Sequence, residues 1–84
     1  MKRGISMDEK ELVEFIAKAL VDNPDNVKVN VVESEKSTII ELTVDESDVG
    51  KIIGKHGRIA KSIRTILSAV SNKSNKRILL DIID

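Results

Sequence analysis

Cysteine is absent from this sequence of 84 residues, and Phe15 is its only aromatic residue. Without cysteine the chain has neither a disulfide framework nor a thiolate metal site, so we expect no metal and a cytoplasmic location. His56 is the only histidine, which also argues against a histidine metal cluster. The scarcity of aromatic residues argues against a protein that binds single strands by stacking bases on aromatic side chains.

Long apolar runs are also missing. None approaches the roughly 20 residues that span a bilayer, and no apolar stretch follows the start Met1-Lys2-Arg3-Gly4 as it would in an export signal. We therefore expect a soluble protein without a membrane partner. We expect residues 1–6 to form a flexible leader and residues 7–84 a single domain, since a chain of this length builds one core.

Acidic residues are absent between Val49 and Leu80, although the chain has 14 acidic and 14 basic residues in all. That segment holds eight of the basic residues: Lys51, Lys55, Arg58, Lys61, Arg64, Lys73, Lys76 and Arg77. The other six share the rest of the chain with all 14 acids. A solvated helix face is the ordinary explanation of such a run, but its length favours a basic surface for a nucleic acid on an acidic body.

Hydrophobic periodicity predicts the element order α-β-β-α-α-β. Ser6 and Glu9 have capping-box spacing and predict a first helix from about Met7 to Val21. Apolar residues at every second position on both sides of a polar turn at 33–37 predict a β-hairpin. Further patterns predict a second helix over 45–53, a third from about Arg58 to Ser71 and a last strand over 77–83.

This order predicts an α+β fold with a three-stranded mixed sheet and three helices on one face. Val32 and Ile39 break the alternation of the hairpin, so we expect the outer face of the sheet to be partly apolar. We expect the first helix to bury Leu12, Val13, Ile16, Ala19 and Leu20, and the third to bury Ile59, Ile63, Ile66, Leu67 and Val70.

The loop Gly54-Lys55-His56-Gly57 separates the second and third helices. Glycine lets backbone approach a ligand closely, and the positive end of the following helix favours an anion. Lys55 and His56 lie between the glycines, and a basic track of Arg58, Lys61 and Arg64 follows. Although Gly-x-x-Gly alone is also a common turn between helices, this context predicts a turn that faces phosphate.

The run Val49-Gly50-Lys51-Ile52-Ile53-Gly54-Lys55-His56-Gly57-Arg58 resembles the signature of KH domains, whose loop clamps four nucleotides of backbone. From about Met7 to Ile83 the chain is similar to the bacterial KhpA family of single type II KH domains, including the stretch Leu12–Val21 and the Asp-Asn-Pro turn after it. The resemblance implies an RNA chaperone or post-transcriptional regulator that binds single-stranded RNA, as a homodimer or with the KH-domain partner KhpB.

Carried over residue by residue, the resemblance implies an RNA site made of Ile52, Ile53, Gly54, Lys55, His56, Gly57, Arg58 and Lys61. The four loop residues would hold the backbone, and the isoleucines and the start of the third helix would line a groove for bases. Ala60 departs from the KH pattern, which often has an aliphatic residue there, and we expect Ile59 to take the packing role.

The main alternative is a protein-interaction or ribosome-associated adaptor built on a KH fold, whose basic face docks an acidic partner. An enzyme is the weakest interpretation. The sequence has no Gly-x-x-x-x-Gly-Lys-Ser/Thr loop, no metal-ligand cluster and no nucleophile beside a histidine base other than His56. We therefore expect no catalytic residue and no cofactor.

Overall fold

A computed structural model of the chain describes residues 8–71 and 76–83. The elements follow the predicted order: α1 (Glu9–Leu20), β1 (Lys28–Glu33), β2 (Ser37–Thr43), α2 (Val49–Ile53), α3 (Arg58–Ser71) and β3 (Arg77–Ile83). Short 3₁₀ turns lie at Pro24–Asn26, Glu46–Asp48 and Lys55–Gly57. The predicted leader, residues 1–6, lies outside the described residues. No helix within 8–71 is long and apolar enough to cross a membrane.

The start of α1 differs from the prediction. Asp8 is the N-cap, because its Oδ1 accepts a hydrogen bond from the Glu11 N–H at 2.8 Å. Glu11 Oε1 in turn accepts from the Asp8 N–H at 3.3 Å. The capping box predicted at Ser6 and Glu9 is therefore wrong by two residues, since Asp8 and Glu11 have the same spacing and Asp caps a helix as well as Ser does.

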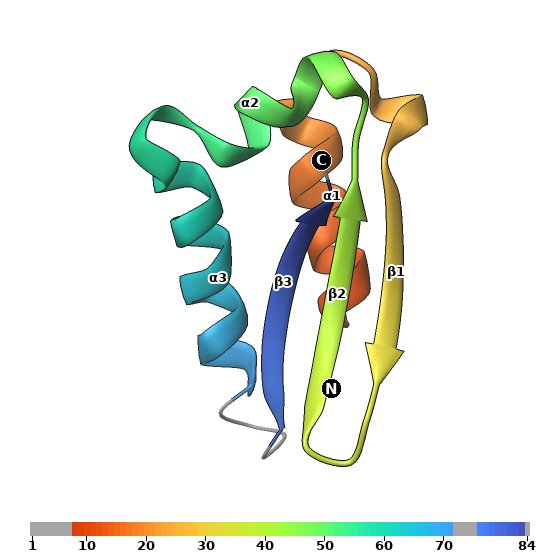
Figure 1. Cartoon of the computed structure of the whole chain (residues 1–84), viewed down its shortest axis with the longest axis vertical. Coiled ribbons are helices and arrows are strands. Elements are labelled where there is room, and N and C mark those ends of the chain that lie inside the picture. The colour runs from red at the N-terminus through yellow and green to blue at the C-terminus, as the bar shows by residue number, and fades with distance from the viewer. Residues whose placement is uncertain (1–7, 72–75, 84) are drawn as a thin grey trace, which may run out of the picture.

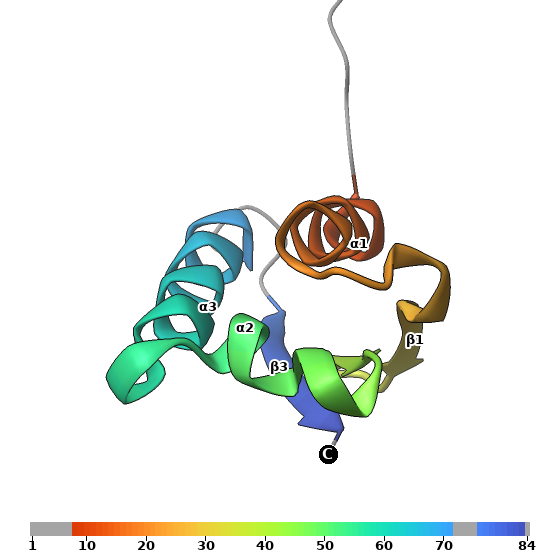
Figure 2. The same cartoon turned by 90° about the horizontal axis from the view of Figure 1, so that it is seen from above.

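The three strands form one mixed sheet in the order β1-β2-β3 (Figure 1). The β1 and β2 strands are antiparallel and pair Val32 with Ile39, whereas β2 and β3 are parallel and pair Ile39 with Leu79. All three helices lie on one side of this sheet (Figure 2). The order of elements, the mixed sheet and the placement of the helices confirm the predicted α+β fold.

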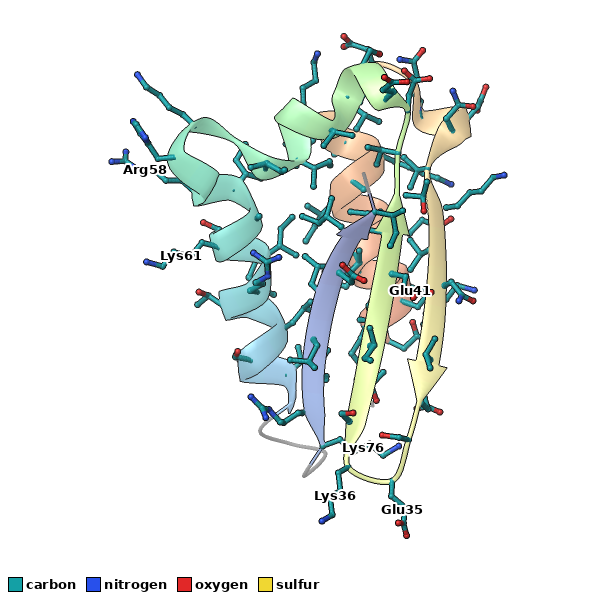
Figure 3. The ribbon with its side chains drawn as sticks, viewed as in Figure 1. Glu35, Lys36, Glu41, Arg58, Lys61 and Lys76 are labelled. Atoms are coloured by element: carbon teal, nitrogen blue, oxygen red, sulfur yellow. The ribbon has the colours of Figure 1, made fainter. Side chains whose placement is uncertain are left out.

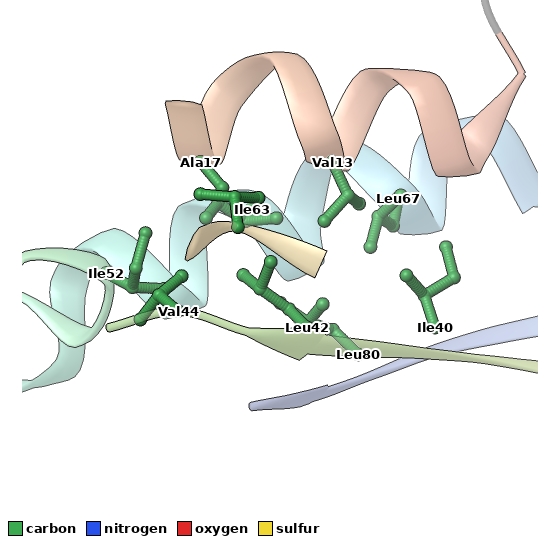
Figure 4. Close-up of a cluster of buried hydrophobic side chains, with 10 residues drawn as sticks. Val13, Ala17, Ile40, Leu42, Val44, Ile52, Ile63, Leu67 and Leu80 are labelled. Atoms are coloured by element: carbon green, nitrogen blue, oxygen red, sulfur yellow. The ribbon is translucent and has the colours of Figure 1, made fainter. Parts of the chain in front are cut away.

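The core lies between the sheet and the helices (Figure 4), and every helix and strand but β1 contributes a fully buried side chain: Val13, Ala17, Ile40, Leu42, Ile52, Ala60, Ile63, Leu67 and Leu80. Two predicted core positions are wrong, because Ala19 is exposed and Ile66 is 44% exposed. Ala17 and Ala60 are buried in their place. Each helix is thus rotated slightly, so that a small residue meets the neighbouring backbone and the packing is closer.

Candidate nucleic-acid interface

The loop Gly54–Gly57 is a tight 3₁₀ turn that joins α2 to α3. Three of its four residues have left-handed φ values: 78° at Gly54, 58° at His56 and 73° at Gly57. The Gly54 N–H donates to the Gly50 carbonyl at 2.8 Å, and the Gly57 N–H donates to the Gly54 carbonyl at 3.1 Å. These bonds reverse the chain direction between the two helices and hold the loop in one conformation.

The two loop glycines are required for different reasons. A Cβ at Gly54 would lie 2.6 Å from Cγ1 of Ile59, which itself packs against the core. This contact confirms that Ile59 takes the packing role, and it presses the loop onto the start of α3. At Gly57 a Cβ would meet nothing within 4 Å, so only its φ calls for glycine. The backbone at Gly57 is therefore open to an approaching ligand.

Lys55 and His56 are both exposed at the middle of the loop. Lys55 lies in the 3₁₀ turn, and His56 follows it with φ 58° and ψ 24°, a left-handed conformation that is uncommon for a residue other than glycine. A right-handed residue followed by a left-handed one forms a backbone nest, which is a concave arrangement that binds anions. The loop therefore combines an anion-binding backbone with two side chains that donate hydrogen bonds.

The structure shows which basic residues around the loop are unpaired. Lys51 lies 3.2 Å from Asp22 Oδ2, and Lys76 lies 3.7 Å from Glu33 Oε1. By contrast, Lys55, Arg58 and Lys61 are exposed and form no ion pair within the described parts of the chain. Figure 3 shows Arg58 and Lys61 pointing away from the body of the molecule on one side of α3. The positive charge of the acid-free segment is therefore concentrated beside the loop.

The two isoleucines before the loop have different environments. Ile52 is fully buried in the core, so its side chain supports α2 from below and has no surface for a ligand. Ile53 is 38% exposed and lies directly before the loop. Of the two, only Ile53 offers an apolar surface to a base.

Arg64 continues the basic track to the edge of the sheet. Its Nη2 lies 3.5 Å from the carbonyl oxygen of Leu80 in β3, which is an edge strand. Its guanidinium therefore lies between α3 and the free edge of β3. The sequence predicted Arg64 only as a member of the basic track, because the contact with β3 depends on how the helix packs.

Asp48 fixes α2 to the turn after α1, a role that the sequence did not indicate. Its carboxylate is 1% exposed and accepts hydrogen bonds from the N–H groups of Asp22 and Asn23 at 3.2 and 3.0 Å and from Asn23 Nδ2 at 3.0 Å. Burial alone would raise the pKa of Asp48, but these hydrogen bonds and the Lys51 ammonium hold the pKa below its ordinary value. The charged carboxylate thus holds the helix that leads into the loop.

The predicted site residues come together, with one exception. The loop, Ile53, Arg58 and Lys61 form one exposed surface around the turn, whereas Ile52 lies beneath it. Within residues 8–71 and 76–83 no group of three or more acidic, histidine or cysteine side chains is arranged to hold a metal ion. The surface can bind an anionic chain through its backbone nest and cations and can offer one apolar side chain beside it.

Comparisons with known proteins agree with this geometry. Residues 10–82 match the family model described as KhpA/KhpB, KH domain. "RNA-binding protein KhpA" of Borreliella burgdorferi is 61% identical over 77 residues, which cover 92% of this chain and 94% of that protein. The proteins of the same name from Aquifex aeolicus and Clostridium perfringens are 52% and 57% identical over 89% and 88% of this chain and over 95% and 99% of their own.

A solved structure shares the fold. Era, crystallised in complex with MgGDPNP and nucleotides 1506–1542 of 16S ribosomal RNA, aligns with a TM-score of 0.59 and 20% identity. The alignment covers 96% of this chain and 35% of that one, so the likeness concerns one part of Era. At this identity the comparison shows the fold alone.

Proposed function

The chain belongs to the KhpA/KhpB family of KH domains, and from this premise we propose that it binds single-stranded RNA by gripping the sugar-phosphate backbone at the loop Gly54–Gly57. The observation that carries the proposal is the loop itself. Its left-handed residues and open backbone lie beside three cations that have no acidic partner among the described residues. Such a surface suits a chain that carries one negative charge per residue.

Phosphate binding would use the backbone and the side chains together. The nest at Lys55 and His56 would hold one phosphate oxygen, and the Lys55 ammonium would neutralise part of its charge. Arg58 and Lys61, one turn apart on α3, would contact the next phosphates. These contacts are independent of base identity, so they would position the RNA without selecting its sequence.

Bases would lie between α3 and the edge of β3. Ile53 would contact the base nearest the loop, and Arg64 would stand midway with its guanidinium at the Leu80 carbonyl. Because β3 is an edge strand, part of its backbone has no partner strand and remains available for hydrogen bonds with base edges. Four nucleotides, as in other KH domains, fit the length of such a surface.

The family supports a wider role without catalysis. Its members named above are RNA-binding proteins, and we propose that this chain acts as an RNA chaperone or post-transcriptional regulator in the cytoplasm. The family description joins KhpA with KhpB, which supports a homodimer or a pair with a KhpB-type protein. We further propose that residues 7–84 form the whole functional domain.

A charge reversal in the loop tests the proposed site. We expect Lys55→Asp with His56→Asp to abolish RNA binding, because it places two negative charges where phosphate must approach. Both side chains are exposed, so the free energy of unfolding should change by about 0.5 kcal/mol or less. Fluorescence anisotropy with short single-stranded RNA measures binding, and thermal melting followed by circular dichroism measures stability.

The matched control is Lys10→Asp with Ala19→Asp, which makes the same change in net charge at exposed positions of α1. This control should weaken binding only slightly, through long-range repulsion that salt screens. If the folded loop variant binds RNA like the parent, the loop is not the RNA site. Binding of an acidic protein by the same basic surface, the adaptor function, would then be the better explanation.

A further inference from the structure

The outer face of the sheet carries an apolar row that crosses all three strands. Val32, Ile39 and Leu79 are direct cross-strand neighbours. Val32 is 46% exposed and Leu79 43% exposed, and Ile83 on the same face of β3 is 39% exposed. Figure 2 shows α1, α2 and α3 on the opposite side of the sheet, so none of them covers this row. A row of aliphatic side chains across a whole sheet is a candidate for contact with another molecule.

Charges flank the apolar row in opposite senses. Because side chains alternate along a strand, Arg77, Leu79 and Asp81 all point to the outer face of β3. Glu41 lies beside Asp81 on β2, while Lys36 is at the hairpin end, where its carbonyl accepts a hydrogen bond from the Arg77 N–H at 3.1 Å. Figure 3, which looks onto this face, shows Glu41 at mid-height and Lys36 at the lower end. One side of the row is therefore basic and the other acidic.

We propose that this face binds the same face of a second copy of the chain, with a twofold axis running along the apolar row. Such an axis keeps each strand opposite its own copy and reverses the strand direction. Leu79 then faces Leu79 of the second copy, and Arg77 faces Asp81 of the second copy. A twofold axis along the strands would instead place the acidic rows against each other. Charge thus selects one of the two symmetric arrangements.

The side chains that would pair are free in the single chain. Neither Arg77 nor Asp81 forms a salt bridge within the part of the chain that the structure describes. Each would gain an oppositely charged partner in the dimer, and the symmetry makes this contact twice. Face-to-face packing of two sheets is also a standard arrangement, with strands aligned within about 30°.

The size of the face sets the strength of the dimer. Three strands about 4.8 Å apart and seven residues long at about 3.3 Å each cover about 300 Å². A typical stable interface buries about 800 Å² on each partner. We therefore expect a weak dimer that forms in the micromolar range or above and dissociates on dilution.

The dimer would leave both RNA sites open. The loop lies on the helical side of the molecule, away from the outer face of the sheet (Figure 2). Two loops on one dimer would bind one RNA with increased avidity, since the second contact becomes intramolecular. This consequence rests on the proposed function, whereas the dimer does not.

Sedimentation of the full chain without RNA, from micromolar to near-millimolar protein, tests the dimer. We expect Arg77→Asp and Asp81→Arg each to weaken self-association roughly tenfold, because two opposite-charge contacts become like-charge contacts. An equal mixture of the two variants should regain parental affinity, because the acids of one variant then face the arginines of the other. Circular dichroism confirms the fold of each variant, and both positions are exposed.

Two further variants separate this face from other surfaces. Leu79→Asp should abolish the dimer, whereas Ile66→Asp, at the exposed apolar position of α3, should leave it unchanged. A monomer at every concentration, a mixture that stays dissociated, or loss of the dimer in Ile66→Asp alone would each overturn the proposal. The Lys55→Asp, His56→Asp variant should dimerise like the parent. Loss of its RNA binding is therefore a separate result.

Discussion

Replacing Gly54 with alanine should destabilise the whole domain, because the loop is pressed against α3 at this residue. Gly54 has φ 78° and ψ 172°, a backbone conformation that is essentially restricted to glycine. The new Cβ would also lie 2.6 Å from Cγ1 and 2.9 Å from Cβ of Ile59. The Ile59 Cβ cannot rotate away, since it is attached directly to the backbone of α3. Either the loop or the helix must therefore move.

The two effects have comparable size. A left-handed or mirror-β conformation costs a residue other than glycine about 1 to 3 kcal/mol. Overpacking by one methyl group costs a further ~1 to 3 kcal/mol. We expect Gly54→Ala to lower the free energy of unfolding by about 2 to 6 kcal/mol, when a domain of 84 residues has only about 4 to 13 kcal/mol in total. The melting temperature should fall by at least about 10 °C.

Two other glycines provide matched controls. Gly57→Ala meets no atom within 4 Å and carries only the cost of φ 73°, so we expect a loss of about 1 to 2 kcal/mol. Gly50→Ala lies in α2 with open space around it, and we expect a gain of up to ~1 kcal/mol from helix propensity. Urea unfolding and thermal melting, both followed by circular dichroism, measure all three variants.

Ile59→Ala in the Gly54→Ala background isolates the steric contact. It should recover the part of the loss that comes from the clash, about 1 to 3 kcal/mol in a double-mutant cycle, and leave the cost of the φ angle. If Gly54→Ala loses no more stability than Gly57→Ala, or if the cycle shows no coupling, then Ile59 does not hold the loop against α3.

The remaining predictions concern salt and acid. RNA binding should weaken with salt with a slope of log K against log salt between roughly −2 and −3, because a few phosphates each contribute about −0.7; titration at several salt concentrations measures it, and a flat response would exclude a grip on the backbone. The pKa of Asp48 is lowered in the folded state, so its contribution to stability is present at neutral pH and is lost as pH falls through that lowered pKa. Urea unfolding should therefore show Asp48→Asn less stable than the parent at neutral pH and the two alike in acid, and an equal gap at both would contradict the role of this carboxylate.

The order of elements and the loop were predictable from local patterns. The bounds Arg58 to Ser71 of α3 and Arg77 to Ile83 of β3 match the prediction, because apolar periodicity, glycine and polar runs act over a few residues. The parallel pairing of β2 with β3 followed from the two helices between them. The start of α1 was missed by two residues because two capping boxes of the same spacing compete in this stretch.

Contacts between distant parts of the chain were not predictable in the same way. Asp48 binds the backbone of Asp22 and Asn23, and Lys51 pairs with Asp22, so two charges that the local pattern places at a helix start in fact hold α2 to the end of α1. The same distance in sequence hides which basic residues of the acid-free segment remain free for RNA.

Helix rotation and cross-strand register complete the difference. Ala60 rather than Ile66 is buried because α3 turns its small residue toward the neighbouring backbone, and burial of apolar surface constrains such a rotation only through the partner that covers it. Val32, Ile39 and Leu79 form one row only because β1, β2 and β3 pair in this register. Local periodicity determines which residues share a face of one element, whereas packing between elements determines which faces meet and which remain exposed.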